Sequence, residues 1–211
     1  MTNLNRFWFC LLYWYYLNKR EFPWRKTNSA YKILIAEILL QQTNARKVEE
    51  VYSNIITNYP SAHELSCAEI DRLTSIIQPI GLTYRAERLI NIAHRICADY
   101  SGRVPNDADR LTALPGVGDY ISDAVLCYAY NKPTVPIDTN VIRLFTRYHS
   151  LSTAKARARC DRDLAENIRA MFIFKNTRIP NLAVLDYASS ICKARAPKCG
   201  HCILNQDCAF Y

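Results

Sequence analysis

The stretch LPGVGDY, Leu114–Tyr120, decides the fold that we expect for this chain. Helical periodicity surrounds it over residues 108–131, so it predicts a tight turn between two helices. Pro115 favours a turn, and Gly116 and Gly118 let backbone N–H groups approach a partner closely. Two glycines that frame an apolar residue at the start of a helix indicate a site for an anion such as phosphate.

The rest of the chain continues this helical pattern. The protein has 211 residues, of which 50% are hydrophobic and 22% charged, as in a soluble globular protein with a substantial core. No alternating strand pattern occurs, so we expect an all-α fold with short connections. The expected helices cover residues 7–17, 30–43, 46–59, 68–76, 85–100, 138–148, 155–169 and 180–192, together with one that opens near Ser61 and the helix–turn–helix of 108–131.

Charge and hydropathy limit the partners. There are 27 Lys and Arg against 19 Asp and Glu, and the net charge of +8 favours a polyanion such as nucleic acid. The apolar run FWFCLLYWYYL, Phe7–Leu17, is too short to span a bilayer and lacks a small-residue cleavage site. We interpret it as a first helix that is buried on most sides. We therefore expect an intracellular protein with no membrane partner, in a compartment where disulfides are rare.

The nine cysteines then need an explanation other than disulfides. Four lie in the C-terminal segment CKARAPKCGHCILNQDC, with the spacing Cys-x6-Cys-x2-Cys-x5-Cys. Four such thiolates can hold zinc or an iron–sulfur cluster, and the single close pair with wide outer gaps favours [4Fe–4S]. The expected ligands are Cys192, Cys199, Cys202 and Cys208, with His201 as a bystander. The other five, Cys10, Cys67, Cys97, Cys127 and Cys160, are expected to be small buried hydrophobic residues.

Together these motifs resemble the helix–hairpin–helix DNA glycosylases of the endonuclease III and MutY type. The resemblance covers nearly the whole chain and implies two all-α lobes with double-stranded DNA, carrying a mismatched or damaged base, in the cleft between them. A six-helix barrel lobe with the helix–hairpin–helix would comprise residues 25–132. The iron–sulfur lobe would comprise residues 1–24 and 133–211, and the protein would be a monomer. The matching motifs are FPWR (22–25), AEILLQQT (36–43), IGL (80–82), RAERL (85–89), LPGVG (114–118), PIDTNVIR (136–143) and the cysteine segment.

The resemblance names three candidate catalytic residues. Asp138 matches the family's essential aspartate, which stabilises positive charge on the sugar, although by itself it would be interpreted as a helix N-cap. Glu37 by itself would be expected at the surface, but in this family it protonates adenine or orients water or the base. Tyr120 stands where members that cut the backbone carry a lysine. Because a phenol cannot form a Schiff base, we predict a monofunctional glycosylase that uses water, with Tyr120 contacting the flipped base.

Further residues are expected to contact DNA. Gln41 and Gln42 would lie beside the flipped base, and Tyr84 would enter the base stack from a loop that is shorter than in most relatives. The cations near the cysteines would face the phosphate backbone. The remaining expected contacts are Leu114, Gly116, Val117 and Gly118 of the hairpin, and Lys193, Arg195 and Lys198 of the cysteine segment.

The resemblance leaves several substrates open. Tyr120 and the end of the sequence soon after Cys208 favour thymine or uracil opposite guanine, which is our prediction. The pair Gln41-Gln42 favours the alternative of an adenine glycosylase acting opposite 8-oxoguanine or guanine. A non-catalytic iron–sulfur protein that senses damage is a further alternative, which the presence of both Glu37 and Asp138 disfavours. An abasic-site lyase is disfavoured by Tyr120.

Overall fold

The structure, a computed structural model, describes residues 3–211, and its regular secondary structure over these residues is helical throughout. The all-α prediction is confirmed. Contacts divide the chain into two compact units. We call Glu21–Lys132 the hairpin unit and Met1–Arg20 with Pro133–Tyr211 the cysteine unit. The sequence-based division had set its boundaries at residues 25 and 133.

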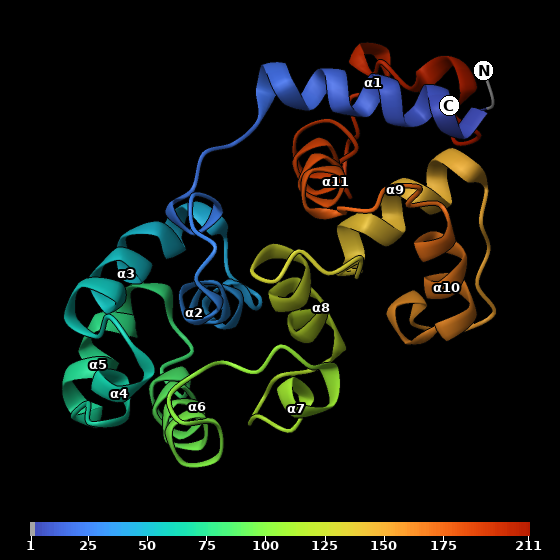
Figure 1. Ribbon diagram of the computed structural model, residues 1–211. Helices are drawn as coiled ribbons and strands as arrows, with labels where there is room; N and C mark the ends of the chain where they lie inside the picture. Colours follow the sequence, from blue (N-terminus) through green and yellow to red (C-terminus); the bar gives the residue numbers. More distant parts are fainter. Residues whose placement is uncertain (1–2) are drawn as a thin grey trace. The chain divides into compact units, whose positions relative to one another are not determined.

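The core of the hairpin unit is built around one helix, α2 (Ala30–Leu40), which packs against α3 and α8 (Figure 1). Every residue of α2 from Ile33 to Leu39 is buried, as expected for a helix that is apolar on all sides. Ser29 caps its N-terminus by accepting a hydrogen bond from the backbone N–H of Lys32. The other helices of this unit are α3 (Ala45–Asn58), α4 (Ala62–Ser66), α5 (Ile70–Ile77), α6 (Arg85–Tyr100), α7 (Ala108–Thr112) and α8 (Asp119–Tyr128), with short 3-10 turns at Pro23–Arg25 and Gln78–Ile80.

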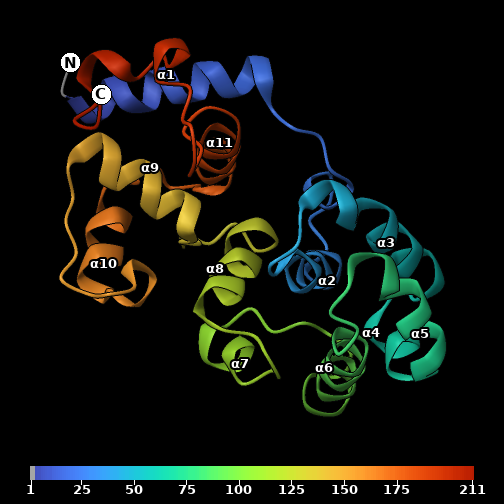
Figure 2. The same ribbon diagram turned by 180° about the vertical axis from the view of Figure 1, so that it is seen from behind.

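The cysteine unit has an aromatic core. Phe7 and Trp8 of the first helix pack against Phe145 and Phe172, with ring centroids 4.8–6.0 Å apart in the contacting pairs. The first helix and α9 both contact α11, and Figures 1 and 2 show this arrangement from opposite sides. The helices of this unit are α1 (Asn3–Asn18), α9 (Thr139–His149), α10 (Arg162–Ala170) and α11 (Arg178–Ser190), with short 3-10 turns at Ala158–Cys160, Cys199–His201 and Asn205–Asp207.

Two predicted helices are shorter than expected. The helix α2 ends at Leu40 rather than Thr43, because Gln41 leaves the helical region (ψ 118°) and Gln42 adopts a left-handed conformation (φ 55°). The prediction of a helix from residue 155 is also wrong. Asp161 accepts a hydrogen bond from the backbone N–H of Leu164 and so begins α10 at Arg162.

The burial of α1 and of the scattered cysteines was also mispredicted. Only one side of α1 is buried, and its exposed side includes Phe9 and Tyr16 at 64% and 72% exposure. Among the five scattered cysteines only Cys127 is buried, whereas Cys67 and Cys160 are exposed. No helix in residues 3–211 is both long enough and apolar enough to cross a membrane.

Candidate functional site

The hairpin between α7 and α8 exposes its backbone to solvent, whereas its apolar side chains are buried. Leu114 and Val117 are only 2% and 5% exposed, and the N–H of Val117 donates to the carbonyl of Leu114 at 3.1 Å. Gly116 turns the chain with a left-handed φ of 72°, and Gly118 is the N-cap residue of α8. The hairpin can therefore offer a partner exposed backbone at Gly116 and Gly118 and the N-terminus of α8, while Leu114 and Val117 anchor it.

The loop after α2 is held from inside the hairpin unit by Arg85. This side chain is fully buried, and it donates to the Leu39 carbonyl at 3.0 Å, to Thr43 Oγ1 at 2.9 Å and to the Gln41 carbonyl. A buried guanidinium is stabilised where its donors find acceptors, and three oxygen atoms at the end of α2 accept from Nη1 and Nη2 of Arg85, whereas its Nε has no hydrogen-bond partner in the described residues. Arg85 therefore ends α2 and leaves Gln42 exposed at its left-handed turn.

A second exposed loop lies between η2 (Gln78–Ile80) and α6. Tyr84, the expected wedge residue, is 48% exposed. Leu82 is 39% exposed and has a left-handed φ of 57°, directly after Gly81 at 71°. A left-handed branched apolar residue on the surface is strained, and such strain is concentrated at functional sites. Leu82, which ends the motif IGL (80–82), is thus a second candidate wedge residue, and no sequence pattern singled it out.

Glu37 is not at the surface, since only 6% of the residue is exposed. It lies close enough to Tyr128 to act on it electrostatically, as do Tyr120, Cys127 and Arg25. Burial raises the pKa of the Tyr128 hydroxyl well above its usual value, Tyr120, Cys127 and Glu37 add to that effect, and Arg25 opposes it. The hairpin unit therefore brings together Glu37, a half-buried Tyr120 and a phenol that stays protonated.

Asp138 caps α9. Its Oδ1 accepts hydrogen bonds from the backbone N–H groups of Asn140 and Val141, both at 2.8 Å, and its Oδ2 accepts one from Asn140 Nδ2. Arg143 donates to Asn140 Oδ1 at 2.9 Å and to the carbonyl of Cys192 at 2.8 Å. The N-cap interpretation of Asp138 is thus correct. The same bonds orient the carboxylate and link it to the cysteine segment, and Asn140 and Arg143 were not selected from the sequence.

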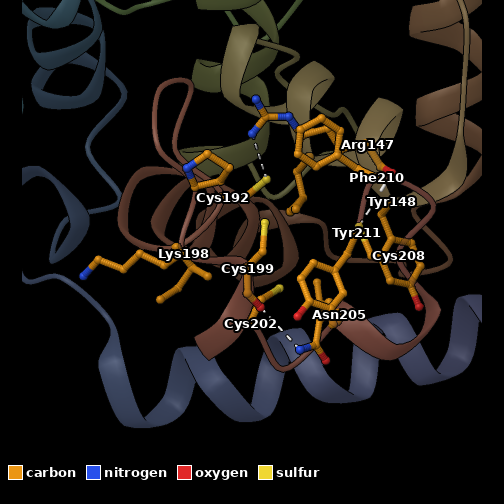
Figure 3. A pocket seen from close by; sticks show the side chains of 14 residues that line it. Arg147, Tyr148, Cys192, Lys198, Cys199, Cys202, Asn205, Cys208, Phe210 and Tyr211 are labelled. Carbon is orange, nitrogen blue, oxygen red and sulfur yellow. Dashed lines mark hydrogen bonds between the residues drawn. The ribbon is translucent and has the colours of Figure 1, made fainter.

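The four predicted cysteine ligands line one pocket of the cysteine unit (Figure 3). The pocket has about 370 Å³ of free space, part of it open to solvent. Within residues 3–211 no three His, Cys, Asp or Glu side chains are grouped to hold a single metal ion. The lining residues include Cys192, Cys199, Cys202 and Cys208.

Two polar side chains lie close to sulfur atoms of the pocket, and one of them, Arg147, donates to a sulfur atom, which fits a thiolate bound to iron. Arg147 Nη1 lies 3.6 Å from Cys192 Sγ, and the Tyr187 hydroxyl lies 2.9 Å from Cys202 Sγ. Arg147 also donates to the carbonyl of Lys193 at 2.7 Å and lies over the ring of Phe210, 4.4 Å from its centroid. These contacts hold the segment around the pocket.

The three predicted DNA-contacting cations of this segment differ in accessibility. Arg195 and Lys198 are exposed, and Lys193 is half-buried. Lys198 also lines the cysteine pocket. Arg195 and Lys198 can therefore meet a phosphate group most directly.

An all-α fold with a two-glycine hairpin, a helix-capping aspartate and a four-cysteine pocket defines the class of helix–hairpin–helix iron–sulfur proteins. The chain belongs to the HhH-GPD superfamily of base excision DNA repair proteins, which matches residues 35–170. Residues 192–208 match the iron–sulfur binding domain of endonuclease III. The family resemblance and the iron–sulfur segment predicted from the sequence are confirmed.

Relatives of known activity match nearly the whole chain. A thymine/uracil-DNA glycosylase of Pyrobaculum aerophilum is 35% identical over 210 residues, covering 95% of this chain and 90% of that protein. An adenine DNA glycosylase of Mycolicibacterium smegmatis is 36% identical over 199 residues, covering 92% of this chain and 66% of that protein. The solved structure of a thermostable thymine-DNA glycosylase has a TM-score of 0.92 at 32% identity, covering 99% of this chain and 96% of that chain.

Proposed function

We propose that this protein is a monofunctional DNA glycosylase that excises thymine or uracil opposite guanine. The observation that carries the proposal is the similarity to a thymine/uracil-DNA glycosylase over nearly the full length of both chains. The adenine glycosylase is as similar in identity but is matched over a smaller share of its length. Double-stranded DNA with a mispaired base is the proposed partner, and the protein acts as a monomer.

In the proposed reaction, water hydrolyses the N-glycosidic bond. When the N-glycosidic bond breaks, its electron pair stays with the base. Thymine or uracil therefore departs as a delocalised anion, and positive charge develops on the sugar. The Asp138 carboxylate stabilises this charge, and the hydrogen bonds that its Oδ1 and Oδ2 accept fix the orientation of the carboxylate before the reaction. The water oxygen bonds to the sugar carbon, and its proton neutralises the departing base.

The hairpin unit supplies the proposed contacts with the base. Glu37 orients the base or the attacking water, and its position in the hairpin unit supports this role, because Glu37 and Tyr120 both lie close enough to Tyr128 to act on it electrostatically. Tyr120 contacts the flipped base beside it. Gln41, Gln42, Tyr84 and the hairpin backbone contact the surrounding DNA, with Leu82 as an added candidate.

We expect Glu37→Gln to lower the single-turnover rate of thymine excision about 100-fold, because the substitution removes the charge and proton-accepting capacity but keeps the shape. Single-turnover excision from a G·T duplex measures this effect. Glu50→Gln, at an exposed position of α3, is the matched control and should keep the wild-type rate. Equal rates for both variants would exclude a catalytic role for Glu37.

Tyr120 leads us to expect no covalent enzyme–DNA adduct. Wild-type protein treated with borohydride during the reaction should trap no DNA, because no amine stands at position 120. Tyr120→Lys should create a trapped adduct, visible as a slower band on a denaturing gel, whereas the control Tyr120→Phe should not. A trapped adduct with the wild-type protein would contradict the monofunctional mechanism.

A panel of labelled duplexes tests the proposed function. We expect alkali-dependent strand breaks at G·T and G·U, and none at A·G, at A·8-oxoguanine or in matched duplex. Breaks only at A·G and A·8-oxoguanine would support the adenine glycosylase instead. Tight binding without excision of any base would support the damage-sensing alternative.

We also propose that the iron–sulfur cluster is [4Fe–4S], held by Cys192, Cys199, Cys202 and Cys208. The spacing of the four cysteines, with one close pair and wide outer gaps, supports a cluster of several atoms over one zinc ion. All four cysteines also line one pocket of the cysteine unit. Chemical analysis should find iron and acid-labile sulfide in equal amounts, four of each per chain. Stoichiometric zinc without iron would refute the proposal.

A further inference from the structure

We propose that Arg88, on α6, is a positioning residue that holds three DNA-facing segments of the hairpin unit together. These segments are the loop at Gln41, the loop at Tyr84 and the hairpin turn at Gly116. The inference rests on the proposed function, because that function gives these segments their contacts with DNA. It adds a residue to which neither the family resemblance nor the proposed mechanism assigns a role.

Arg88 contacts all three segments through one half-buried side chain. Its Nη1 donates a hydrogen bond to Gln41 Oε1 at 3.0 Å, and its guanidinium carbon lies 5.1 Å from the centroid of the Tyr84 ring. A Cβ atom at Gly116 would lie 2.7 Å from Arg88 Nε and 2.8 Å from its Cδ. Segments that are distant in sequence therefore meet at this one guanidinium.

The contact with Gln41 determines how the amide of this residue is presented. Arginine has hydrogen-bond donors and no acceptor, so it selects the amide orientation in which Oε1 faces Arg88. Both hydrogens of the Gln41 amide are then left for other partners. Arg85 holds the backbone carbonyl of the same residue, so Gln41 is fixed at both its main chain and its side chain. Gln41 is thereby prepared to donate hydrogen bonds to base acceptors.

The contact with Tyr84 restrains an exposed aromatic side chain. A guanidinium over an exposed ring is attracted electrostatically by the ring face, and this attraction favours one ring orientation. The orientation matters because Tyr84, at 48% exposure, is the expected wedge. An ordered wedge has less conformational entropy to lose when DNA binds.

The turn at Gly116 needs glycine for two reasons, and the contact with Arg88 is one of them. Its φ of 72° is unfavourable for residues with a side chain, and the space that a Cβ would fill is occupied by Arg88. The hairpin turn thus packs directly on the same guanidinium that holds Gln41 and Tyr84. Any side chain at residue 116 would push Arg88 away from its two other contacts.

The experiment compares Arg88→Gln with Arg88→Lys and with the control Arg95→Gln. Arg95 lies on the same helix and makes an exposed ion pair with Asp99 at 2.8 Å, so the control removes a cation and an ion pair away from the site. The readouts are the melting temperature, the dissociation constants for G·T and matched duplexes, and the fluorescence of 2-aminopurine placed beside the mispair. The dissociation-constant ratio and the fluorescence report recognition and base flipping, which a purely structural role would not change.

We expect Arg88→Gln to reduce the preference for G·T over matched duplex about 10-fold and to diminish the 2-aminopurine signal, because the hydrogen bond to Gln41 and the contact with Tyr84 are lost together. Arg88→Lys should recover part of the preference, since lysine can still donate to Gln41 but lacks the planar group. Arg95→Gln should match the wild type. An Arg88→Gln variant that recognises G·T as Arg95→Gln does would overturn the inference.

A double-mutant cycle tests the packing of Arg88 on Gly116. Gly116→Ala should lower the melting temperature and the affinity for G·T more in the wild-type background than in the Arg88→Ala background, where only backbone strain remains. Additive effects of the two substitutions would show that the contact has no energetic consequence, and would contradict the inference. If wild-type protein excises no base, the proposed function fails, whereas the affinities and the cycle still decide the role of Arg88.

Discussion

Asp138→Asn is expected to lower the single-turnover rate of base excision about 1000-fold, the largest effect that we expect on the chemistry. The substitution removes the negative charge that would face the developing positive charge on the sugar. It keeps a residue that caps helices as well as aspartate does, so the backbone N–H groups of Asn140 and Val141 retain their acceptor. The rate should fall far more than the stability.

Stability measurements separate the charge of Asp138 from its role as a cap. The asparagine variant loses the bond from Asn140 Nδ2, a cost of about 1 kcal/mol that lowers the melting temperature by about 2–4 °C. Asp138→Ala also loses the cap and should melt lower still. Asp107→Asn, at the N-cap of α7, is the matched control and should retain full activity. A rate for Asp138→Asn within a few-fold of wild type would refute the proposed mechanism.

Cys202→Ser is expected to have the largest effect on the integrity of the protein. A serine hydroxyl is a poor ligand for iron, so the variant should lose the cluster together with its visible absorbance and iron content. Binding free energies of structural metals are on the order of 10 kcal/mol and contribute directly to folding. The segment 192–208 is built from short turns around the pocket, so it depends on this contribution. We expect a marked drop in the melting temperature and rapid proteolysis in this segment.

Cys160→Ser provides the matched control for the loss of a thiol. Cys160 is exposed in the same unit and does not line the cysteine pocket, so its substitution should leave absorbance, iron content and melting temperature unchanged. Removal of iron from the wild-type protein with a chelator should reproduce the behaviour of Cys202→Ser. Wild-type absorbance in the Cys202→Ser variant would show that Cys202 is not a ligand.

The sequence predicts those structural features that depend only on residues close together in the chain. The amphipathic pattern of residues 85–100 predicted α6 to the residue, because its apolar face recurs at helical spacing. The turn at Pro115 and Gly116 and the cap at Asp138 were likewise visible in a few consecutive residues. The cysteine spacing predicted an iron–sulfur segment for the same reason, since all four residues lie within 192–208.

Predictions from the sequence were wrong or incomplete where contacts between distant residues outweigh the local conformational preference of the chain. Residues 155–161 have helical composition, yet Asp161 is used as a cap and holds Thr153, so the helix starts later. Glu37 lies among apolar neighbours in sequence, and only packing shows that it is buried rather than exposed. Leu82 was passed over because its left-handed conformation cannot be read from its side chain.

The sequence by itself determined the all-α class, the hairpin, the iron–sulfur segment and the family, because each depends on residue types at short, regular spacing. Only the tertiary structure decided how side chains from different segments meet. It showed Arg85 under the loop at Gln41, Arg88 between Gln41, Tyr84 and Gly116, and Arg143 between Asn140 and the cysteine segment. An arginine has several donors on a long side chain, so its partners are chosen by the folded arrangement of acceptors and not by its neighbours in sequence.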